Sequence, residues 1–167
     1  MPGARARRSG VPRPSYLIAL GSNLRSRHGS PERTIAAAIA ALAGVVAVSP
    51  ILRTPPLGPS NRRFANAAAL VESDEAPPAL LRRLKAIERD FGRRRGVRWG
   101  ARVLDLDIIL WSGGPWHGEG LVVPHPAFRE RGFVLEPLLA VAPEWRDPLT
   151  GLSIRQLAAR LRRARRR

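Results

Sequence analysis

Two aspartates separated by one residue are the side chains whose type and spacing point most directly to chemistry. Asp105, Asp107 and Ile109 alternate with Leu104, Leu106, Ile108 and Leu110. In an extended strand this alternation places both carboxylates and Ile109 on one face and the other four residues on the opposite face. At about 3.3 Å per residue they lie about 6.6 Å apart. A divalent cation relieves the repulsion between them, and Mg²⁺ favours carboxylates together with phosphates. The alternative is an edge strand that turns its aspartates to solvent.

A basic segment stands directly before the acidic pair, around Trp99 and three glycines. Its cationic residues are Arg93, Arg94, Arg95, Arg98 and Arg102. Guanidinium groups bind phosphate oxygens through paired hydrogen bonds, and the glycines give the loop freedom to close over a ligand. Cations next to carboxylates fit a metal–triphosphate site better than a nucleic-acid groove, where the carboxylates would repel the backbone. A solvated basic loop, with Trp99 as a surface anchor, is the alternative.

A proline-rich segment and one amide suggest a site for a flat ring. Residues 54–59 read Thr-Pro-Pro-Leu-Gly-Pro, a stiff loop that can present backbone groups to a heterocycle at low entropic cost. Asn66 stands in an otherwise apolar run, where a buried amide without a partner is costly. Its amide both donates and accepts hydrogen bonds, which suits the lactam edge of a pterin. Phe64 and Phe133 are candidates to stack on the ring, or else are core residues.

One histidine is held between prolines. His125 lies between Pro124 and Pro126, with Arg129 and Arg131 shortly after it. Its fixed position would let it bind a phosphate or a metal-bound water. A structural turn histidine explains the pattern equally well.

The elements that must position these residues follow from hydrophobic periodicity and from turn and cap residues. The pattern predicts strands at 16–20, 45–52, 64–71 and 103–111, and helices starting at Pro31, Pro77 and after Ser153. Residues 124–131 are expected to form a loop, and residues 134–141 a short helix or strand. This order predicts an α+β protein with a ferredoxin-like α/β sandwich, its helices packed on an antiparallel sheet.

Length and charge set the domain organisation. The 167 residues are 44% apolar, contain no cysteine and carry a formal charge of +16. We expect one domain over 15–160, a flexible basic arm over 1–14 and a basic tail over 161–167, and we give the terminal charge little functional weight. The longest apolar stretch, 35–48, is shorter than the roughly 18 residues of a membrane span. With no signal-peptide pattern, a soluble cytoplasmic protein is expected.

In their order along the chain, these segments resemble the 6-hydroxymethyl-7,8-dihydropterin pyrophosphokinase family. The resemblance runs from Tyr16 to Glu144, and its most specific part is Arg98 to Ile109, which joins the basic loop to the acidic strand. The other matching segments are 19–24 (Ala-Leu-Gly-Ser-Asn-Leu), 53–59, 64–68, 123–125 and 131–133.

The resemblance implies transfer of the terminal diphosphate of ATP to 6-hydroxymethyl-7,8-dihydropterin, releasing AMP, in folate biosynthesis. It implies two Mg²⁺ ions on Asp105 and Asp107, which would be catalytic together with Arg93 and Arg102. It implies an ATP site of Glu88, Arg93, Arg95, Trp99, Arg102, His125 and Arg131. The implied pterin contacts are Thr54, Pro55, Leu57, Phe64, Asn66 and Phe133. The expected partners are these small molecules, not nucleic acid or a membrane, and the expected state is a monomer.

Some positions depart from the family pattern. Phe64 stands where some members have tyrosine, Pro126 replaces a tyrosine, and Lys85 takes a place often filled by glutamine. The stretch from Gly92 to Trp99 is a residue shorter than in some members, so the roles of Arg94 and Arg95 are interchangeable in this comparison. The arginine-rich ends have no counterpart.

Two other functions are weighed against this one. An RNA-binding module on the same kind of sheet would need a cluster of exposed aromatic residues, which one tyrosine and four phenylalanines do not provide. A nucleotidyltransferase would use the two aspartates to bind metal in the same way, with another acceptor. It would not explain the proline-rich segment or Asn66.

Overall fold

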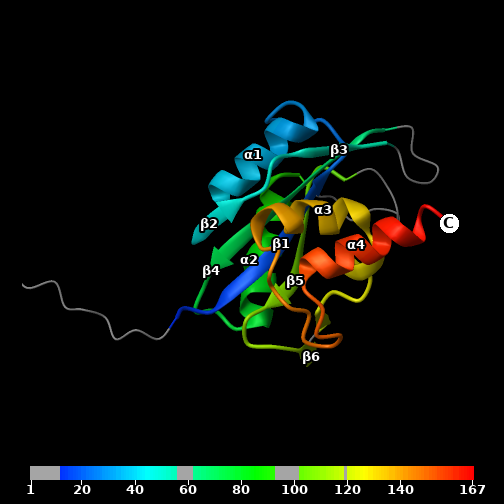
Figure 1. The fold of residues 1–167 in the computed structure, drawn as a ribbon. Coiled ribbons are helices and arrows are strands. Elements are labelled where there is room, and N and C mark those ends of the chain that lie inside the picture. The colour runs from blue at the N-terminus through cyan, green and yellow to red at the C-terminus, as the bar shows by residue number, and fades with distance from the viewer. Residues whose placement is uncertain (1–11, 56–61, 93–101, 119) are drawn as a thin grey trace, which may run out of the picture.

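An antiparallel sheet forms the centre of the molecule (Figure 1). The structure, a computed structural model, describes residues 12–55, 62–92, 102–118 and 120–167. Within these residues the sheet contains β1 (Ser15–Ser22), β2 (Val45–Val48), β3 (Leu52–Thr54), β4 (Phe64–Glu72) and β5 (Asp105–Trp111). The strand order is β2-β4-β1-β5, and β3 continues beside β4. Every one of these pairings is antiparallel.

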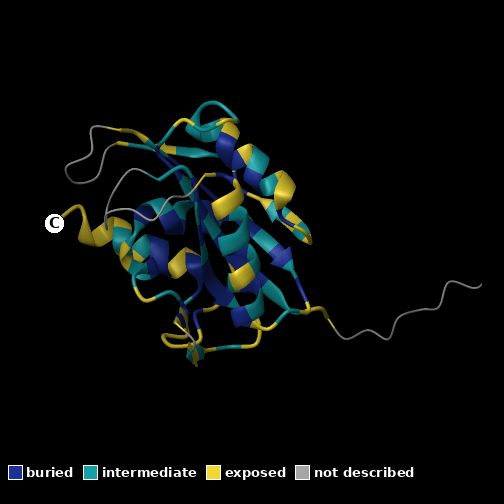
Figure 2. Ribbon diagram, turned by 180° about the vertical axis from the view of Figure 1, so that it is seen from behind, coloured by how far each residue is buried: buried dark blue, intermediate teal, exposed yellow. Residues whose placement is uncertain are grey.

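Helices cover both faces of the sheet. Helices α1 (Pro31–Ala41) and α2 (Pro77–Asp90) pack on one face, whereas α3 (Gly132–Val141) and α4 (Ile154–Ala164) cover the other. Figure 1 shows α3 and α4 in front of the sheet, and Figure 2, seen from behind, shows the first two helices with their exposed residues turned outward. A short turn of 3-10 helix, Phe128–Glu130, precedes α3, and β6 (Trp116–Gly118) pairs with β7 (Leu121–Val123) in a separate hairpin.

The connectivity confirms the predicted ferredoxin-like α+β fold. The chain runs β1-α1-β2, continues through β3 and β4, and then runs α2-β5. Helix α1 therefore links β1 and β2, which lie on either side of β4, and α2 links β4 and β5, which lie on either side of β1. This is the split β-α-β arrangement. This topology brings the end of β1 between the beginnings of β4 and β5.

Two apolar layers hold the helices on the sheet. Tyr16, Ile18 and Leu20 of β1 are buried against α1 and α2, while Leu17 is buried against α3 and α4. Alternate side chains of one strand thus serve opposite layers, and burial of each large aliphatic side chain stabilises the fold by about 1.5–3 kcal/mol. Local signals agree with this packing, since Ser30 caps α1 and Ser153 forms a capping box that starts α4.

A bulge in β5 corrects one prediction from the alternation. Strict alternation places Ile109 beside the aspartates and Leu110 beside Leu106, but Ile109 and Leu110 both pack in the layer under α3 and α4. The register against β1 shifts there, because Leu17 pairs with Leu110 and the next residue, Ile18, pairs with Ile108. The extra residue restarts the alternation and leaves both aspartates on the predicted common face.

Other boundaries also differ from the prediction. The strand expected over 45–52 is two strands, because Pro50 has no N–H to continue the ladder. Ser49 supplies the hydrogen bonds to β4 at this point. Its backbone N–H donates to Ala68 O at 2.9 Å, and its Oγ accepts from Ala68 N at 2.9 Å. Thr54, expected outside regular structure, ends β3.

The C-terminal part of the chain is helical. Residues 132–141 form a helix even though it contains Pro137. Of the two structures predicted for 134–141, a short helix or a strand, the helix is therefore the one observed. Helix α4 continues to Ala164, past the expected start of the basic tail at residue 161.

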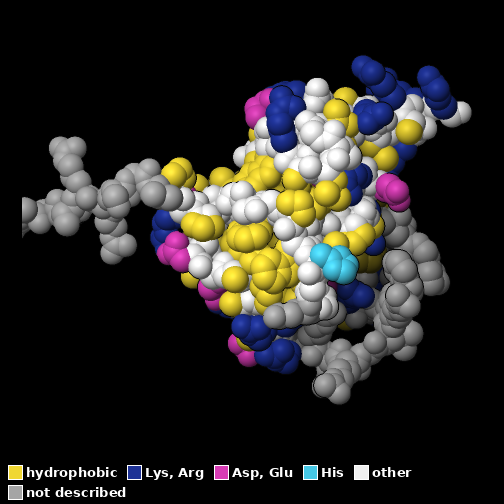
Figure 3. Space-filling view, turned by 90° about the horizontal axis from the view of Figure 1, so that it is seen from below, with side chains coloured by type: hydrophobic (Ala, Val, Ile, Leu, Met, Phe, Trp, Pro, Cys, Tyr) yellow, Lys and Arg dark blue, Asp and Glu magenta, His cyan; other side chains and the backbone are white. Residues whose placement is uncertain are grey.

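The end of the molecule away from the aspartates is rich in aromatic residues. Tyr16 stacks on Trp111 with ring centroids 6.1 Å apart, and Trp111 meets Trp116 edge to face with centroids 6.2 Å apart. Seen from below, this end carries a patch of apolar side chains with charged residues around it (Figure 3). In the described part of the chain, no helix combines the length and apolar character needed to cross a bilayer.

Candidate active site

The acidic pair lies at the end of the sheet where three strands meet. Asp105 pairs with Gly21 of β1, and Gly21 pairs with Asn66 of β4. One residue pair further along, Asp107 lies opposite Ala19, and Ala19 lies opposite Ala68. Directly paired residues turn their side chains to the same face, so the carboxylates and the Asn66 amide share one face of the sheet.

Small residues form a flat floor between the aspartates and the amide. Gly21 and Ala19, both partly exposed, separate the two sets of polar groups, whereas Ala68 beside Ala19 is fully buried under α3 and α4. A Cβ at Gly21 would lie 3.4 Å from Asn66 Oδ1. Because Asn66 and Asp105 are two strands apart, about 9–10 Å of sheet surface lies between their backbones. A flat molecule on this floor would have the amide on one side and the carboxylates on the other.

Asp107 is held in an unfavourable electrostatic position. Burial raises the pKa of its carboxyl group, and the neighbouring Asp105 raises it further, whereas Lys85 and His125 act in the opposite direction. Within the described residues no donor hydrogen-bonds to this carboxylate. A bound cation would remove both causes of the shift, because it replaces lost solvation and screens the like charge.

The donor set suits a metal that is shared with a substrate. Among the described residues, no three acidic, histidine or cysteine side chains lie together as a complete protein metal site. Mg²⁺ is commonly held by one or two carboxylates, with phosphate oxygens and waters completing the shell. The two aspartates therefore fit Mg²⁺ that arrives with a phosphate ligand.

Arg102 stands against the first aspartate. Its Nη1 lies 2.7 Å from Asp105 Oδ2, and the side chain remains 40% exposed, so this contact does not enclose the guanidinium. Asn23 fixes its backbone, since Arg102 N donates to Asn23 Oδ1 at 2.6 Å and Asn23 N donates to Arg102 O at 3.1 Å. Asn23 had no predicted role beyond its place in the matching segment 19–24. A buried amide directly after a strand is the signal that marks it.

Helix α2 supports the strand from its outer edge. Glu88 is fully buried, and its Oε1 accepts from Leu106 N at 2.7 Å and from Lys85 Nζ at 2.8 Å. Lys85 Nζ also lies 3.4 Å from Leu106 O. Leu106 lies between the two aspartates on β5, which is an edge strand of the sheet. Lys85 and Glu88 therefore form hydrogen bonds with backbone groups that have no neighbouring strand on that side. Glu88, predicted to bind ATP, supports the acidic strand in this structure, and Lys85 had no predicted role.

The histidine loop approaches the carboxylates from the other side. His125 N donates to Ile109 O at 3.0 Å, which fixes the loop on β5. His125 Nδ1 accepts from Ala127 N at 3.2 Å, so the proton of the neutral ring is on Nε2. Burial lowers the pKa of His125, Asp107 partly opposes this, and Arg131 lowers it further. A neutral ring with a free Nε2–H is a donor suited to a phosphate oxygen.

The predicted pterin residues gather on the same face of the sheet. Asn66 Nδ2 donates to Thr54 Oγ1 at 3.1 Å, and Phe64, opposite Thr54, is two residues from Asn66 along β4. Phe133, on α3, packs at the border of the layer on this face. Its ring lies 5.9 Å from the guanidinium carbon of Arg131. The structure thus brings together an amide, a hydroxyl and two aromatic rings.

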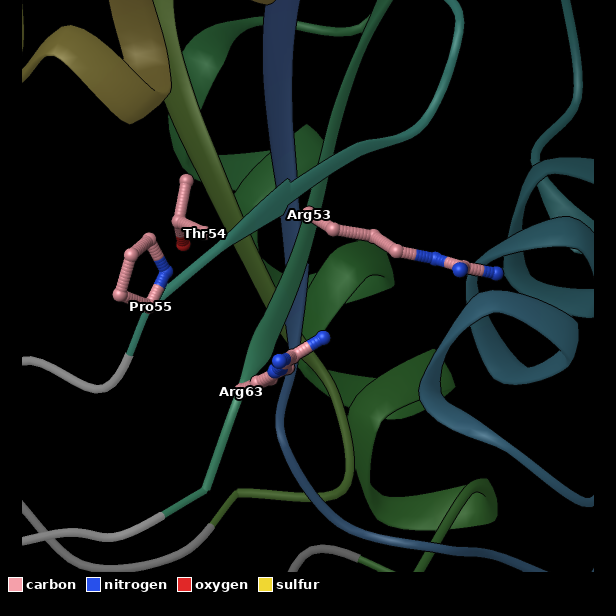
Figure 4. Close-up of a pocket in the computed structure, with 4 residues that line it drawn as sticks. All are labelled: Arg53, Thr54, Pro55 and Arg63. Carbon is pink, nitrogen blue, oxygen red and sulfur yellow. The ribbon is translucent and has the colours of Figure 1, made fainter.

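A pocket of about 260 Å³ opens beside Thr54, lined by Arg53, Thr54, Pro55 and Arg63. Figure 4 shows Arg53 and Thr54 pointing to opposite sides of β3, with Arg53 directed toward α1. There Arg53 Nε lies 2.8 Å from Glu32 Oε1. The aspartates do not line this pocket. The predicted residues Leu57, Arg93, Arg95 and Trp99 lie outside the described residues, so the structure defines only part of the site.

Paired carboxylates beside an arginine, at one end of a ferredoxin-like antiparallel sheet, form an arrangement that suits phosphoryl transfer. A family model described as 7,8-dihydro-6-hydroxymethylpterin-pyrophosphokinase (HPPK) matches residues 17–143. A 2-amino-4-hydroxy-6-hydroxymethyldihydropteridine pyrophosphokinase from Pseudomonas aeruginosa is 43% identical over 137 residues, which are 78% of this chain and 82% of that protein. The Methylorubrum extorquens enzyme of the same name is 38% identical over 150 residues, covering 86% and 91%.

Solved structures agree on the fold. A crystal structure described as HPPK-DHPS in complex with substrates has a TM-score of 0.71 at 13% identity and covers 92% of this chain. Wild-type HPPK-DHPS from Plasmodium falciparum has a TM-score of 0.66 at 14% identity and covers 89%. This chain spans 45% of either solved chain.

The chain belongs to the HPPK family. It is an ATP-using enzyme that transfers a pyrophosphoryl group to hydroxymethyldihydropterin in folate biosynthesis. The function predicted from the sequence is therefore confirmed.

Proposed function

We propose that Asp105 and Asp107 would hold two Mg²⁺ ions together with the phosphates of ATP at this end of the sheet. The observation that carries this proposal is Asp107, a carboxylate with raised pKa, a neighbouring carboxylate and no hydrogen-bond donor among the described residues. When bound, Mg²⁺ supplies neutralisation of the phosphate charge and alignment of the reacting oxygens. The reaction needs little covalent help from the protein, because positioning and charge neutralisation supply most of the rate.

In this proposal the hydroxymethyl oxygen of the pterin attacks the β-phosphorus of ATP. The hydroxyl O–H bond breaks and its proton passes to solvent water, and a new P–O bond forms. The bond from the β-phosphorus to the α,β-bridging oxygen breaks, and AMP leaves with that oxygen. Arg102 is placed to bind a phosphate oxygen with the part of its guanidinium that does not contact Asp105. His125 donates a hydrogen bond from Nε2 to a phosphate oxygen. Arg131 adds a positive charge near His125. A neutral His125 can donate this hydrogen bond without a carboxylate beside it to balance a positive charge.

The flat floor is the proposed place for the pterin ring. Asn66 and Thr54 offer donors and acceptors to its polar edge, and Phe64 and Phe133 supply aromatic faces. Pro55 borders the same pocket as Thr54. With the amide on one side of the floor and the carboxylates on the other, the hydroxymethyl group would point toward the metal site. Gly21 keeps this path open, since any side chain there would stand between the two.

A product assay with matched variants tests the proposal. Purified protein, Mg²⁺, ATP and 6-hydroxymethyl-7,8-dihydropterin should give AMP rather than ADP. Asp107→Asn should lower turnover by at least about a hundredfold, since loss of one charge-stabilising group costs about 2.7–4 kcal/mol. Asp90→Asn makes the same chemical change at an exposed position at the end of α2 and should retain activity. Turnover of Asp107→Asn within a few-fold of wild type would refute the metal assignment.

The assembly and location of the enzyme are also part of the proposal. We infer a monomer in the cytoplasm that acts on ATP and the pterin. Sedimentation at micromolar concentration should give the mass of a single chain. A stable dimer under these conditions would overturn this inference.

A further inference from the structure

Helix α4 is fixed alongside α3 in the opposite direction. Arg155 Nη2 lies 2.7 Å from Glu144 Oε1, and Arg162 Nε donates to Glu136 Oε1 at 2.8 Å. Glu136 is one turn into α3, so the last turn of α4 lies against the first turn of α3. Figure 1 shows the end of α4 next to the beginning of α3. The C-terminal arginines, which had no role in the family pattern, are therefore placed near Arg131 and Phe133.

One of these arginines lies directly on the backbone of Gly132. A Cβ added to Gly132 would lie 2.7 Å from Arg165 Nη1, 3.2 Å from Cζ and 3.3 Å from Nη2. Three of the four heavy atoms of the guanidinium group are thus within contact distance of the space above this glycine. Any larger residue at position 132 would push the guanidinium away.

The charges at this place are not balanced. Arg165 makes no ion pair with a carboxylate of the described residues, whereas Arg155 and Arg162 on the same helix both do. Arg131, directly before Gly132, is a second cation, and the positive end of the α3 dipole adds to both. The positive charges of Arg131 and Arg165 and the start of α3 would all attract a bound anion.

We propose that Arg165 is a further residue of the nucleotide site, which binds the phosphates of ATP beside Arg131. The proposal rests on the assignment of Arg131 to ATP made above, and it extends the site from the sheet and its loops to the C-terminal helix. The ligand class is a polyphosphate, because a guanidinium group binds phosphate oxygens in pairs and Arg165 lies over Gly132, directly after the residue Arg131 that is assigned to ATP.

Binding measurements with matched variants test it. Arg165→Gln should weaken binding of a nonhydrolysable ATP analogue, measured with Mg²⁺ by calorimetry, by about five- to tenfold at low salt. Arg160→Gln removes the same charge from an exposed position of the same helix and should bind as wild type. The difference between the two variants should shrink as salt rises, because screening weakens an exposed contact. Equal binding by Arg165→Gln and wild type would overturn the proposal.

Shorter ligands identify the group that Arg165 contacts. Inorganic tripolyphosphate should lose affinity for Arg165→Gln as strongly as the ATP analogue does, whereas AMP should lose less. A loss seen with AMP and not with tripolyphosphate would overturn the phosphate contact and place Arg165 at the nucleoside.

Gly132 provides a second test through the same contact. Gly132→Ala should displace the guanidinium and reproduce the effect of Arg165→Gln, and the two changes should not add in the double variant. Fully additive losses would show that they act separately and would overturn the argument from contact. Turnover of Asp107→Asn separates this proposal from the proposed function. If Asp107→Asn is inactive and Arg165→Gln binds normally, only the role of Arg165 fails.

Discussion

Replacement of Lys85 by methionine tests how the acidic strand is supported. The change keeps the apolar stem of the side chain and removes the charge that lies 2.8 Å from the carboxylate of Glu88. Glu88 is fully buried, so the loss of this partner leaves a negative charge with less compensation in the interior.

The magnitude follows from the exposure of the two partners. Breaking a fully buried ion pair costs about 3–5 kcal/mol. The Lys85 side chain is 34% exposed, and water can therefore replace part of what it supplies. We expect Lys85→Met to lower the free energy of unfolding by about 2–3 kcal/mol, or the melting temperature by about 5–10 °C for a chain of this size.

Chemical denaturation of three variants measures this effect. Lys85→Met combined with Glu88→Gln should recover most of the loss, because a neutral amide in place of the buried charge removes the main penalty. Arg82→Met, an exposed change on the same helix, should stay within about 0.5 kcal/mol of wild type, as surface substitutions commonly do. The reasoning is refuted if Lys85→Met matches Arg82→Met, or if the double variant is no more stable than the single one.

Three further predictions concern a buried carboxylate, a turn and the pterin floor. Burial alone raises the pKa of Asp147, but hydrogen bonds from Arg129 and its neighbours outweigh it and the net pKa is lowered. Its stabilisation is therefore present above the pKa of the unfolded chain, near 4, and is lost as pH falls through the lower folded value. Asp147→Asn should be less stable than wild type at pH 7, and the gap should narrow below about pH 4 in thermal melts; a constant gap contradicts this. Gly44→Ala should destabilise by more than about 2 kcal/mol in urea, because φ is +77° and the new Cβ would lie 2.1 Å from Glu72 O; normal stability would contradict the turn geometry. Asn66→Leu should weaken pterin binding by at least about tenfold while ATP-analogue binding is kept, and a loss of nucleotide binding instead would place the amide elsewhere.

The fold could be predicted from the sequence because its strongest signals are local. Ser30 before Pro31 and Ser153 before a periodic segment mark helix starts, and alternation around Asp105 marks a buried strand face. These signals depend on hydrogen bonds and spacing within a few residues. They are therefore visible without the partner elements.

Features that depend on a partner strand could not be predicted in the same way. The bulge that turns Leu110 to the layer of Ile109 exists only because β1 and β5 differ in register by one residue. The split at Pro50 depends on Ser49 reaching Ala68 of the neighbouring strand. The hairpin of β6 and β7 has strands of three residues each, too short to give a recognisable period.

The candidate site shows the same division. Motif residues such as Asp107, Asn66 and His125 were recognised from their chemical type, and the structure brings them to one end of the sheet. Lys85 and Asn23 were not recognised, because their roles consist of hydrogen bonds to backbone groups of a distant strand and loop. Such contacts leave no spacing pattern in a single sequence.

Binding of Mn²⁺, as a paramagnetic substitute for Mg²⁺, tests the proposed metal site most directly. With a nonhydrolysable ATP analogue present, electron paramagnetic resonance of the free ion should show two Mn²⁺ bound per wild-type chain. The variant with both Asp105→Asn and Asp107→Asn should bind no more Mn²⁺ than the nucleotide carries by itself. Two ions bound with unchanged affinity in that variant would contradict the account.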